Sequence, residues 1–160
     1  THVKQDAERA MRLIRSRSAE YKIDPNRIGA MGFSAGGEVV AMIAYNAKNT
    51  LEKSSDAIDK QDAQPNFQML IYPGPLFIPK EIKSDAPPAF LLAANDDTCC
   101  SAPIVDLLNK YRLANVPIEM HLYSKGGHAF NMGKRAKSNS LKTWPQRLTD
   151  WFEDNNYFVK

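Results

Sequence analysis

The sequence predicts an α/β fold of about four parallel strands flanked by helices. Short apolar runs with the length of buried strands alternate with segments that have helical spacing. The runs are continuously apolar, which is typical of a parallel sheet covered on both faces. A chain of 160 residues has the size of one domain. We therefore expect residues 1–160 to form a single α/β domain.

The first expected helix covers residues 5–21, a segment without Gly or Pro. Apolar residues with helical spacing are expected to face the core: Ala10, Leu13 and Ile14. The arginines between them are then expected to face mostly outward: Arg9, Arg12 and Arg15. Asp24 and Pro25 end this helical segment.

A strand, a turn of small residues and a second helix are expected next. The apolar run 27–33 predicts the strand, residues 34–37 form the turn, and a helix follows from Glu38 to about residues 46–49. Residues 50–66 are polar and have no sustained period, so they predict a long, mobile surface loop.

The remaining sequence continues the alternation of strands and helices. Three apolar runs bounded by Pro, Asn, Asp or Gly predict buried strands at 67–72, 89–94 and 118–123. Helical patterns follow at 103–111, which starts with Pro near its first turn, and from Thr143, where Thr143-Trp144-Pro145 opens a terminal helix.

Composition excludes several classes of protein. Hydrophobic residues make up 43% and charged residues 24% of the chain, which excludes a disordered or low-complexity protein. The net charge is only +3 and the basic residues are scattered, so we expect neither a nucleic acid nor a membrane as a partner. Cys99 and Cys100 are adjacent, without zinc-site or redox-motif spacing, and are expected to pack as small apolar residues.

The run Gly32-Phe33-Ser34-Ala35-Gly36 matches G-x-S-x-G between a predicted strand and a predicted helix. A nucleophilic serine there needs a strained turn that exposes its hydroxyl. Side chains at Gly32 and Gly36 are expected to collide with the turn backbone, which explains both glycines. The N–H of Ala35 is the expected oxyanion donor.

A serine nucleophile needs a histidine base, and the chain has only three histidines. His2 lies at a terminus and His121 lies within a predicted strand. His128 follows Gly126-Gly127 just after that strand, where catalytic loops of parallel sheets gather. His128 is therefore the expected base.

The carboxylate that orients the histidine should also follow a strand. Asp96 and Asp97 both follow the strand at 89–94, and the residues alone leave either as the acid. Glu38 and Asp85 are weaker candidates, because Glu38 lies inside a helix and Asp85 precedes its strand. The chain order of serine, acid and histidine is that of G-x-S-x-G hydrolases.

The sequence resembles the carboxylesterase and acetylxylan-esterase-like group of α/β-hydrolase esterases, in the hormone-sensitive-lipase-like lineage. The resemblance covers nearly the whole chain and is carried by these segments: Asp6-Ala7 with Arg9-Ala10, residues 23–28, residues 31–37, Pro87-Pro88-Ala89-Phe90, Lys125 to Phe130, Trp144-Pro145 and Trp151. It implies that Asp97, the second aspartate of its pair, is the acid.

The resemblance also implies a function. Esters of short acyl groups, above all acetyl groups on xylan or other plant polysaccharides and oligosaccharides, are the implied substrates, and small synthetic esters are accepted too. No metal and no organic cofactor are expected. A bacterial origin is implied.

The resemblance extends only to the carboxyl-terminal half of such enzymes. We find no His-Gly-Gly-Gly motif, so Ala35 is the only evident oxyanion donor and the first strands of the fold are expected to be missing. The strand before Ser34 would then form an unpaired apolar edge, which predicts a homo-oligomer.

Two alternatives to an esterase remain open at this stage. A serine peptidase of the prolyl-oligopeptidase type has a similar elbow around its nucleophile. Alternatively, the chain is a catalytically impaired remnant or an interaction module that keeps the elbow but cannot complete an oxyanion hole.

Overall fold

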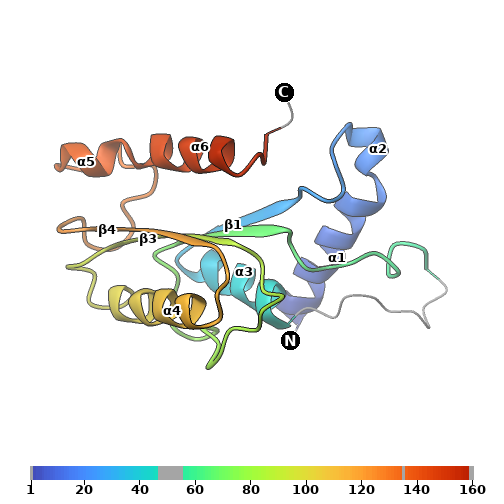
Figure 1. Cartoon of the computed structure of the whole chain (residues 1–160), viewed down its shortest axis with the longest axis horizontal. Helices are drawn as coiled ribbons and strands as arrows, with labels where there is room; N and C mark the ends of the chain where they lie inside the picture. Colours follow the sequence, from blue (N-terminus) through green and yellow to red (C-terminus); the bar gives the residue numbers. More distant parts are fainter. Residues whose placement is uncertain (1, 47–55, 135, 159–160) are drawn as a thin grey trace.

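A single four-stranded parallel sheet forms the centre of the fold (Figure 1). The computed structural model describes residues 2–46, 56–134 and 136–158. The strands lie side by side in chain order: β1 Gly29–Phe33, β2 Phe67–Ile71, β3 Ala89–Ala94 and β4 Ile118–Tyr123. This arrangement confirms the α/β prediction, and each strand lies where an apolar run predicted it.

Helices cover both faces of this sheet. Those that the structure describes are α1 His2–Ser16, α2 Ser18–Tyr21, α3 Ala35–Asn46, α4 Ser101–Leu113, α5 Asn139–Lys142 and α6 Trp144–Asp154. In Figure 1, α3 and α4 lie below the sheet, and α5 and α6 lie above it. The short α5 was not predicted from the sequence. None of the described helices has the length and apolar character needed to cross a membrane.

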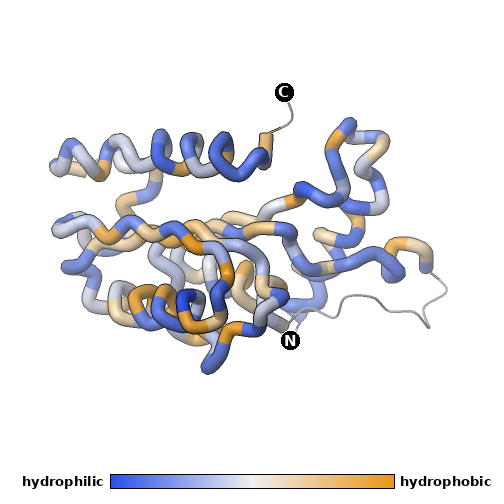
Figure 2. Tube along the Cα trace, in the orientation of Figure 1, coloured by the Kyte–Doolittle hydropathy of each residue, from blue (hydrophilic) through white to orange (hydrophobic). Residues whose placement is uncertain are grey.

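The two larger core clusters among the described residues form two layers, one on each face of the sheet. Successive residues of β3 alternate between them, so that Phe90 and Leu92 face one layer and Leu91 and Ala93 the other. The first layer is completed by residues of the last two helices: Leu141, Trp144, Leu148 and Trp151. The second layer is completed by residues of α3 and α4: Val40, Ile104, Leu107 and Tyr111. Hydrophobic positions accordingly follow the strands and α4 in Figure 2.

Helix α1 differs from the sequence expectation in the face that it buries. Arg12 is 3% and Arg15 is 9% exposed, whereas Ala10 is exposed and Ile14 is 36% exposed. The prediction that these arginines face outward was wrong. Their guanidinium groups donate to backbone carbonyls of a segment that lies along α1, and these bonds compensate for their burial.

That segment is the described part of the predicted loop 50–66; residues 50–55 lie outside the described residues. Residues 56–66 contain no helix or strand. Arg12 Nε donates to the Gln61 carbonyl at 3.1 Å, and Arg15 donates to the carbonyls of Asp62 and Gln64 at 3.0 and 2.8 Å. Arg9 forms ion pairs of 2.6 Å with the segment's carboxylates, Asp56 and Asp59. The arginines of α1 thus attach this segment to the fold.

Candidate active site

Ser34 forms the whole connection between β1 and α3. Strand β1 ends at Phe33 and α3 begins at Ala35, so the chain must reverse at one residue. Ser34 accordingly has a φ of +50°, in the left-handed region that L-residues rarely adopt. Its N–H donates to the Ile71 carbonyl of β2 at 3.0 Å, and its carbonyl accepts from the Gly37 N–H at 2.9 Å. The backbone is held in this strained turn from both sides.

Only one of the two motif glycines is required by steric contact. A Cβ at Gly32 would lie 2.2 Å from the backbone oxygen of Gly36, a distance that no side chain can occupy. A Cβ at Gly36 would meet no heavy atom within 4 Å. The predicted collision at Gly36 was therefore wrong, because the Gly36 backbone is what Gly32 packs against.

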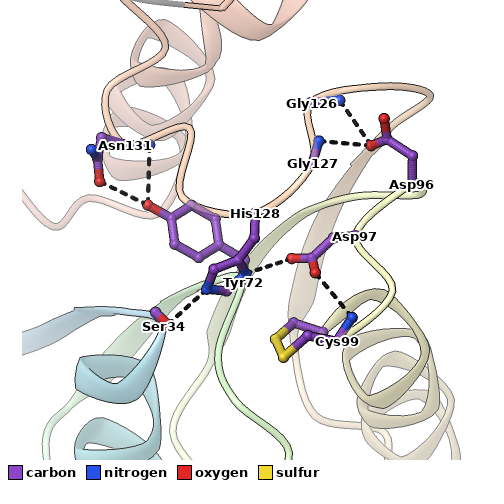
Figure 3. A network of polar contacts seen from close by, with 10 residues as sticks. Ser34, Tyr72, Asp96, Asp97, Cys99, Gly126, Gly127, His128 and Asn131 are labelled. Atoms are coloured by element: carbon purple, nitrogen blue, oxygen red, sulfur yellow. Dashed lines mark hydrogen bonds and ion pairs between the residues drawn. A yellow bond between two sulfur atoms is a disulfide. The ribbon is translucent and has the colours of Figure 1, made fainter.

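The structure brings Ser34, His128 and Asp97 into one hydrogen-bonded chain (Figure 3). Ser34 Oγ lies 2.8 Å from His128 Nε2, and His128 Nδ1 lies 2.8 Å from Asp97 Oδ2. The three residues follow β1, β4 and β3, whose carboxyl ends meet at one edge of the parallel sheet. Because an ionised carboxylate can only accept, Nδ1 is the protonated nitrogen and Nε2 is free to accept from the serine.

Asp97 is buried and fixed by the loop around it. It is 2% exposed, and its second oxygen, Oδ1, accepts the Cys99 N–H at 3.1 Å. Its backbone N–H donates to the Ala94 carbonyl at 3.0 Å, and its carbonyl accepts the Ser101 N–H at 3.2 Å. Both carboxylate oxygens thus have donors, and the carboxylate is aligned on the imidazole before any substrate binds.

Asp96 has a different partner from Asp97. Its Oδ1 accepts the N–H groups of Gly126 and Gly127 at 2.9 and 2.8 Å (Figure 3). The bond from Gly127 is the largest cause that lowers the pKa of Asp96 below its ordinary value, and the bond from Gly126 adds to it. Gly127 has a φ of +61°. Of the two aspartates, the structure places Asp97 on the imidazole and Asp96 on the loop that carries it.

The other candidate residues lie elsewhere. Glu38 Oε1 accepts the Leu76 N–H at 3.1 Å. Asp85 precedes β3, at the opposite edge of the sheet from Ser34. His2 begins α1 and is exposed, and His121 Nε2 lies 2.8 Å from Glu119 Oε1 within β4. The structure places none of these four side chains in the hydrogen-bonded chain of Ser34, His128 and Asp97.

Tyr72 is a residue of the site that the sequence analysis missed. Its ring is 1% exposed and meets the His128 imidazole edge to face, with 4.9 Å between centroids. Its hydroxyl donates to Asn131 Oδ1 at 3.0 Å and accepts the Asn131 N–H at 3.1 Å. Burial raises the pKa of Tyr72 above its ordinary value, so the phenol stays protonated. The sequence offers one signal for Tyr72: it precedes Pro73-Gly74, at the end of a predicted strand and so at the sheet edge where Ser34 lies.

Residues with positive φ gather around the hydrogen-bonded chain. They are Ser34, Tyr72, Gly127, Ala129 and Asn131. Backbone strain of this kind persists only where surrounding contacts enforce it, and it is concentrated at functional sites. The backbone around His128 therefore has the strained conformations that are typical of functional sites.

A pocket of about 550 Å³ opens beside His128. It is lined by residues that follow β4, among them Ala129, Phe130, Asn131, Met132 and Lys134. Aromatic, amide and cationic residues therefore line a pocket that includes His128.

One group of potential metal ligands occurs among the described residues. The ligand atoms of Asp97, Cys99, Cys100 and His128 lie within 4.8 Å of one another. The two sulfurs are joined in a disulfide, and the carboxylate and imidazole are bonded to each other. In this state neither sulfur is a thiolate ligand. The expectation that both cysteines pack as small apolar residues was right for Cys100, which is buried, and wrong for Cys99, which is exposed.

Comparison with known proteins identifies the fold. The BD-FAE family model matches residues 2–72, a span that includes Ser34. An acetyl ester-xyloside bifunctional hydrolase from Caldicellulosiruptor lactoaceticus superposes with a TM-score of 0.88 and 25% identity, over 98% of this chain and 66% of that chain. The chain has the α/β-hydrolase fold. A thermophilic esterase from Thermogutta terrifontis shares this fold, with a TM-score of 0.79 and 20% identity over 98% of this chain and 65% of its own.

Two curated proteins are similar in sequence to this chain. An acetylxylan esterase of Xylanibacter ruminicola is 26% identical over 162 residues, and an endo-1,4-beta-xylanase B of Butyrivibrio fibrisolvens is 23% identical over 160 residues. Each match covers 80% of this chain but only 31% and 24% of those proteins. The chain thus spans a third or less of these relatives. The resemblance to the carbohydrate-esterase group of α/β hydrolases is confirmed.

Proposed function

We propose that this α/β-hydrolase domain is a serine esterase that removes short acyl groups, chiefly acetyl, from plant polysaccharides or oligosaccharides such as xylan. The single observation that carries the proposal is the hydrogen-bonded chain from Ser34 through His128 to the buried Asp97. The acetylxylan esterase and the acetyl ester-xyloside hydrolase among its relatives support the substrate class.

The geometry suits nucleophilic catalysis. Ser34 Oγ, exposed on its strained turn, attacks the ester carbonyl while Nε2 of His128 takes its proton over 2.8 Å. The imidazolium that forms keeps its Nδ1–H on Asp97, whose negative charge stabilises it. His128 then donates the proton to the leaving alcohol. Water activated by the same histidine releases the acid from the acyl-enzyme.

The oxyanion forms next to the first turn of α3. Ala35 begins this helix, and the first N–H groups of a helix have no acceptor within it. The positive end of the helix dipole also faces this position. We assign the Ala35 N–H as one oxyanion donor. Removing a single donor typically lowers the rate by about 10² to 10³, so the number of further donors strongly affects turnover.

The test compares the wild-type chain with Ser34→Ala on p-nitrophenyl acetate, acetylated xylo-oligosaccharides and a dipeptide amide. We expect serine-dependent release of acetate from both esters, and labelling of the wild type but not the variant by a serine-directed phosphonate. Equal labelling of both proteins would refute Ser34 as the nucleophile. Preferential cleavage of the amide would favour a peptidase, and ester turnover that does not depend on Ser34 would contradict the proposal.

A further inference from the structure

The Cys99–Cys100 disulfide lies next to the proposed acid and has no part in the mechanism above. It joins adjacent residues, so it closes a small ring with the peptide bond between them and links no distant segments. A crosslink of this kind gains almost nothing from loop closure, which is the usual source of disulfide stabilisation. Its effect must therefore be local.

The ring directly contacts Asp97. The Cys99 N–H donates to Asp97 Oδ1 at 3.1 Å (Figure 3). The Cys100 N–H donates to the Asp97 carbonyl at 3.3 Å. Asp97 Oδ2 is the atom that holds His128. The donor that fixes one oxygen of the carboxylate thus belongs to the ring, and the other oxygen orients the imidazole.

The two cysteine residues lie in different environments. Cys100 is fully buried and belongs to the core cluster that also contains Tyr72 and Trp144. Cys99 is exposed. A thiol reagent in solution therefore reaches the pair at Cys99, while Cys100 anchors the segment in the core.

We propose that Cys99 and Cys100 form a reversible redox site that controls the alignment of Asp97, with a dithiol as the reductant. Only the expected effect of this redox site on ester turnover rests on the proposed function. The oxidised ring keeps the Cys99 N–H on Asp97. The reduced pair frees the backbone at Cys99 and weakens that hydrogen bond.

The exchange is balanced by the reductant. A thiolate of the dithiol attacks Cys99 Sγ, the bond to Cys100 Sγ breaks, and Cys100 leaves as a thiolate that takes up a proton. The second thiol of the reductant then displaces Cys99, giving two cysteine thiols and one cyclic disulfide of the reductant. Two electrons and two protons move to the protein.

Reduction should lower kcat and leave KM unchanged. Losing one hydrogen bond to the carboxylate, with its full effect on the imidazole, corresponds to a roughly two- to tenfold decrease in kcat. The hydrolysis of p-nitrophenyl acetate is therefore measured before reduction, after dithiothreitol and after reoxidation. Alkylation and mass measurement count the free thiols in the same samples. We expect two thiols with the lowered kcat, and recovery on reoxidation.

Two variants serve as controls. Cys99→Ala removes the exposed sulfur and leaves the buried Cys100 in the core, so it should keep the fold, show the lowered kcat and ignore dithiothreitol. Cys100→Ser removes the disulfide by changing the buried cysteine. It should show the same lowered kcat and the same lack of response to dithiothreitol. An unchanged kcat in a sample that carries two alkylated thiols would overturn the proposal, as would a failure to reduce the pair in the native protein.

A readout that does not need turnover separates this proposal from the proposed function. The amide resonance of Cys99 and the Nδ1–H resonance of His128 report the two hydrogen bonds to Asp97 directly. Both should shift on reduction even in Ser34→Ala. If no form of the chain hydrolyses esters but these resonances shift, the esterase proposal fails and the redox site stands. If turnover is Ser34-dependent and neither resonance moves on reduction, the redox site fails alone.

Discussion

Asp96 holds the loop that carries His128, so we expect its carboxylate to affect kcat although it does not contact the substrate. Its bonds to the N–H groups of Gly126 and Gly127 lower its pKa, which means that the ionised form stabilises the fold. This stabilisation is complete above the ordinary aspartate pKa of about 3.9 and is lost as the pH falls through the lowered folded value. We expect Asp96→Ala to lower kcat about tenfold by displacing the imidazole. Urea unfolding should show a stability deficit at pH 6 that shrinks at pH 3, and an equal deficit at both would contradict this assignment.

At the same scale, the sequence predicted which candidate side chains come together better than how their positions are fixed. Ser34 and His128 could be chosen because each follows a strand and all strand ends of a parallel sheet meet at one edge. The strand pattern left Asp96 and Asp97 equivalent, and only the family resemblance pointed to Asp97. The contact of Tyr72 with His128, and the separate partner of Asp96, depend on a loop with positive φ at Gly127, Ala129 and Asn131. Local patterns do not determine such a path, because tertiary contacts enforce it.

At the scale of elements, the junction of β1 and α3 depends on one close backbone approach. Gly32→Ala would place a Cβ 2.2 Å from the Gly36 carbonyl, and we expect it to destabilise the fold by about 1–3 kcal/mol or more. Gly36→Ala is the matched control, because its Cβ would meet open space and alanine favours a helix. Urea unfolding of both variants checks this. A deficit of equal size in Gly36→Ala would show that the approach at Gly32 is not the cause.

Strands and long helices were predictable because periodicity and length distinguish them, and their bounds differ from expectation by a few residues. The face of α1 that is buried could not be predicted in this way. Arg12 and Arg15 are buried because they supply donors to the carbonyls of residues 56–66, a segment remote in sequence. Helix α5, Asn139–Lys142, is too short for any period to indicate it.

At the scale of the whole molecule, the sheet ends in two edges of different character. The outer side of β1 has no neighbouring strand among the described residues, and β1 contains no charged side chain. The opposite edge strand, β4, contains the Glu119–His121 pair. Charged residues on an edge oppose pairing with another chain, whereas an uncharged edge permits it. Met31, in the middle of β1, is 44% exposed.

We therefore propose that two copies of the chain pair through their β1 edges as a two-fold dimer, in which the same strand meets itself. Light scattering should give twice the mass of one chain at micromolar concentration. Met31→Lys places a charge on this edge and should give monomers. Leu122→Lys is the control, because Leu122 is 41% exposed on β4 and its charge should leave the dimer intact. A monomeric wild type, or a dimer that survives Met31→Lys, would exclude pairing through β1.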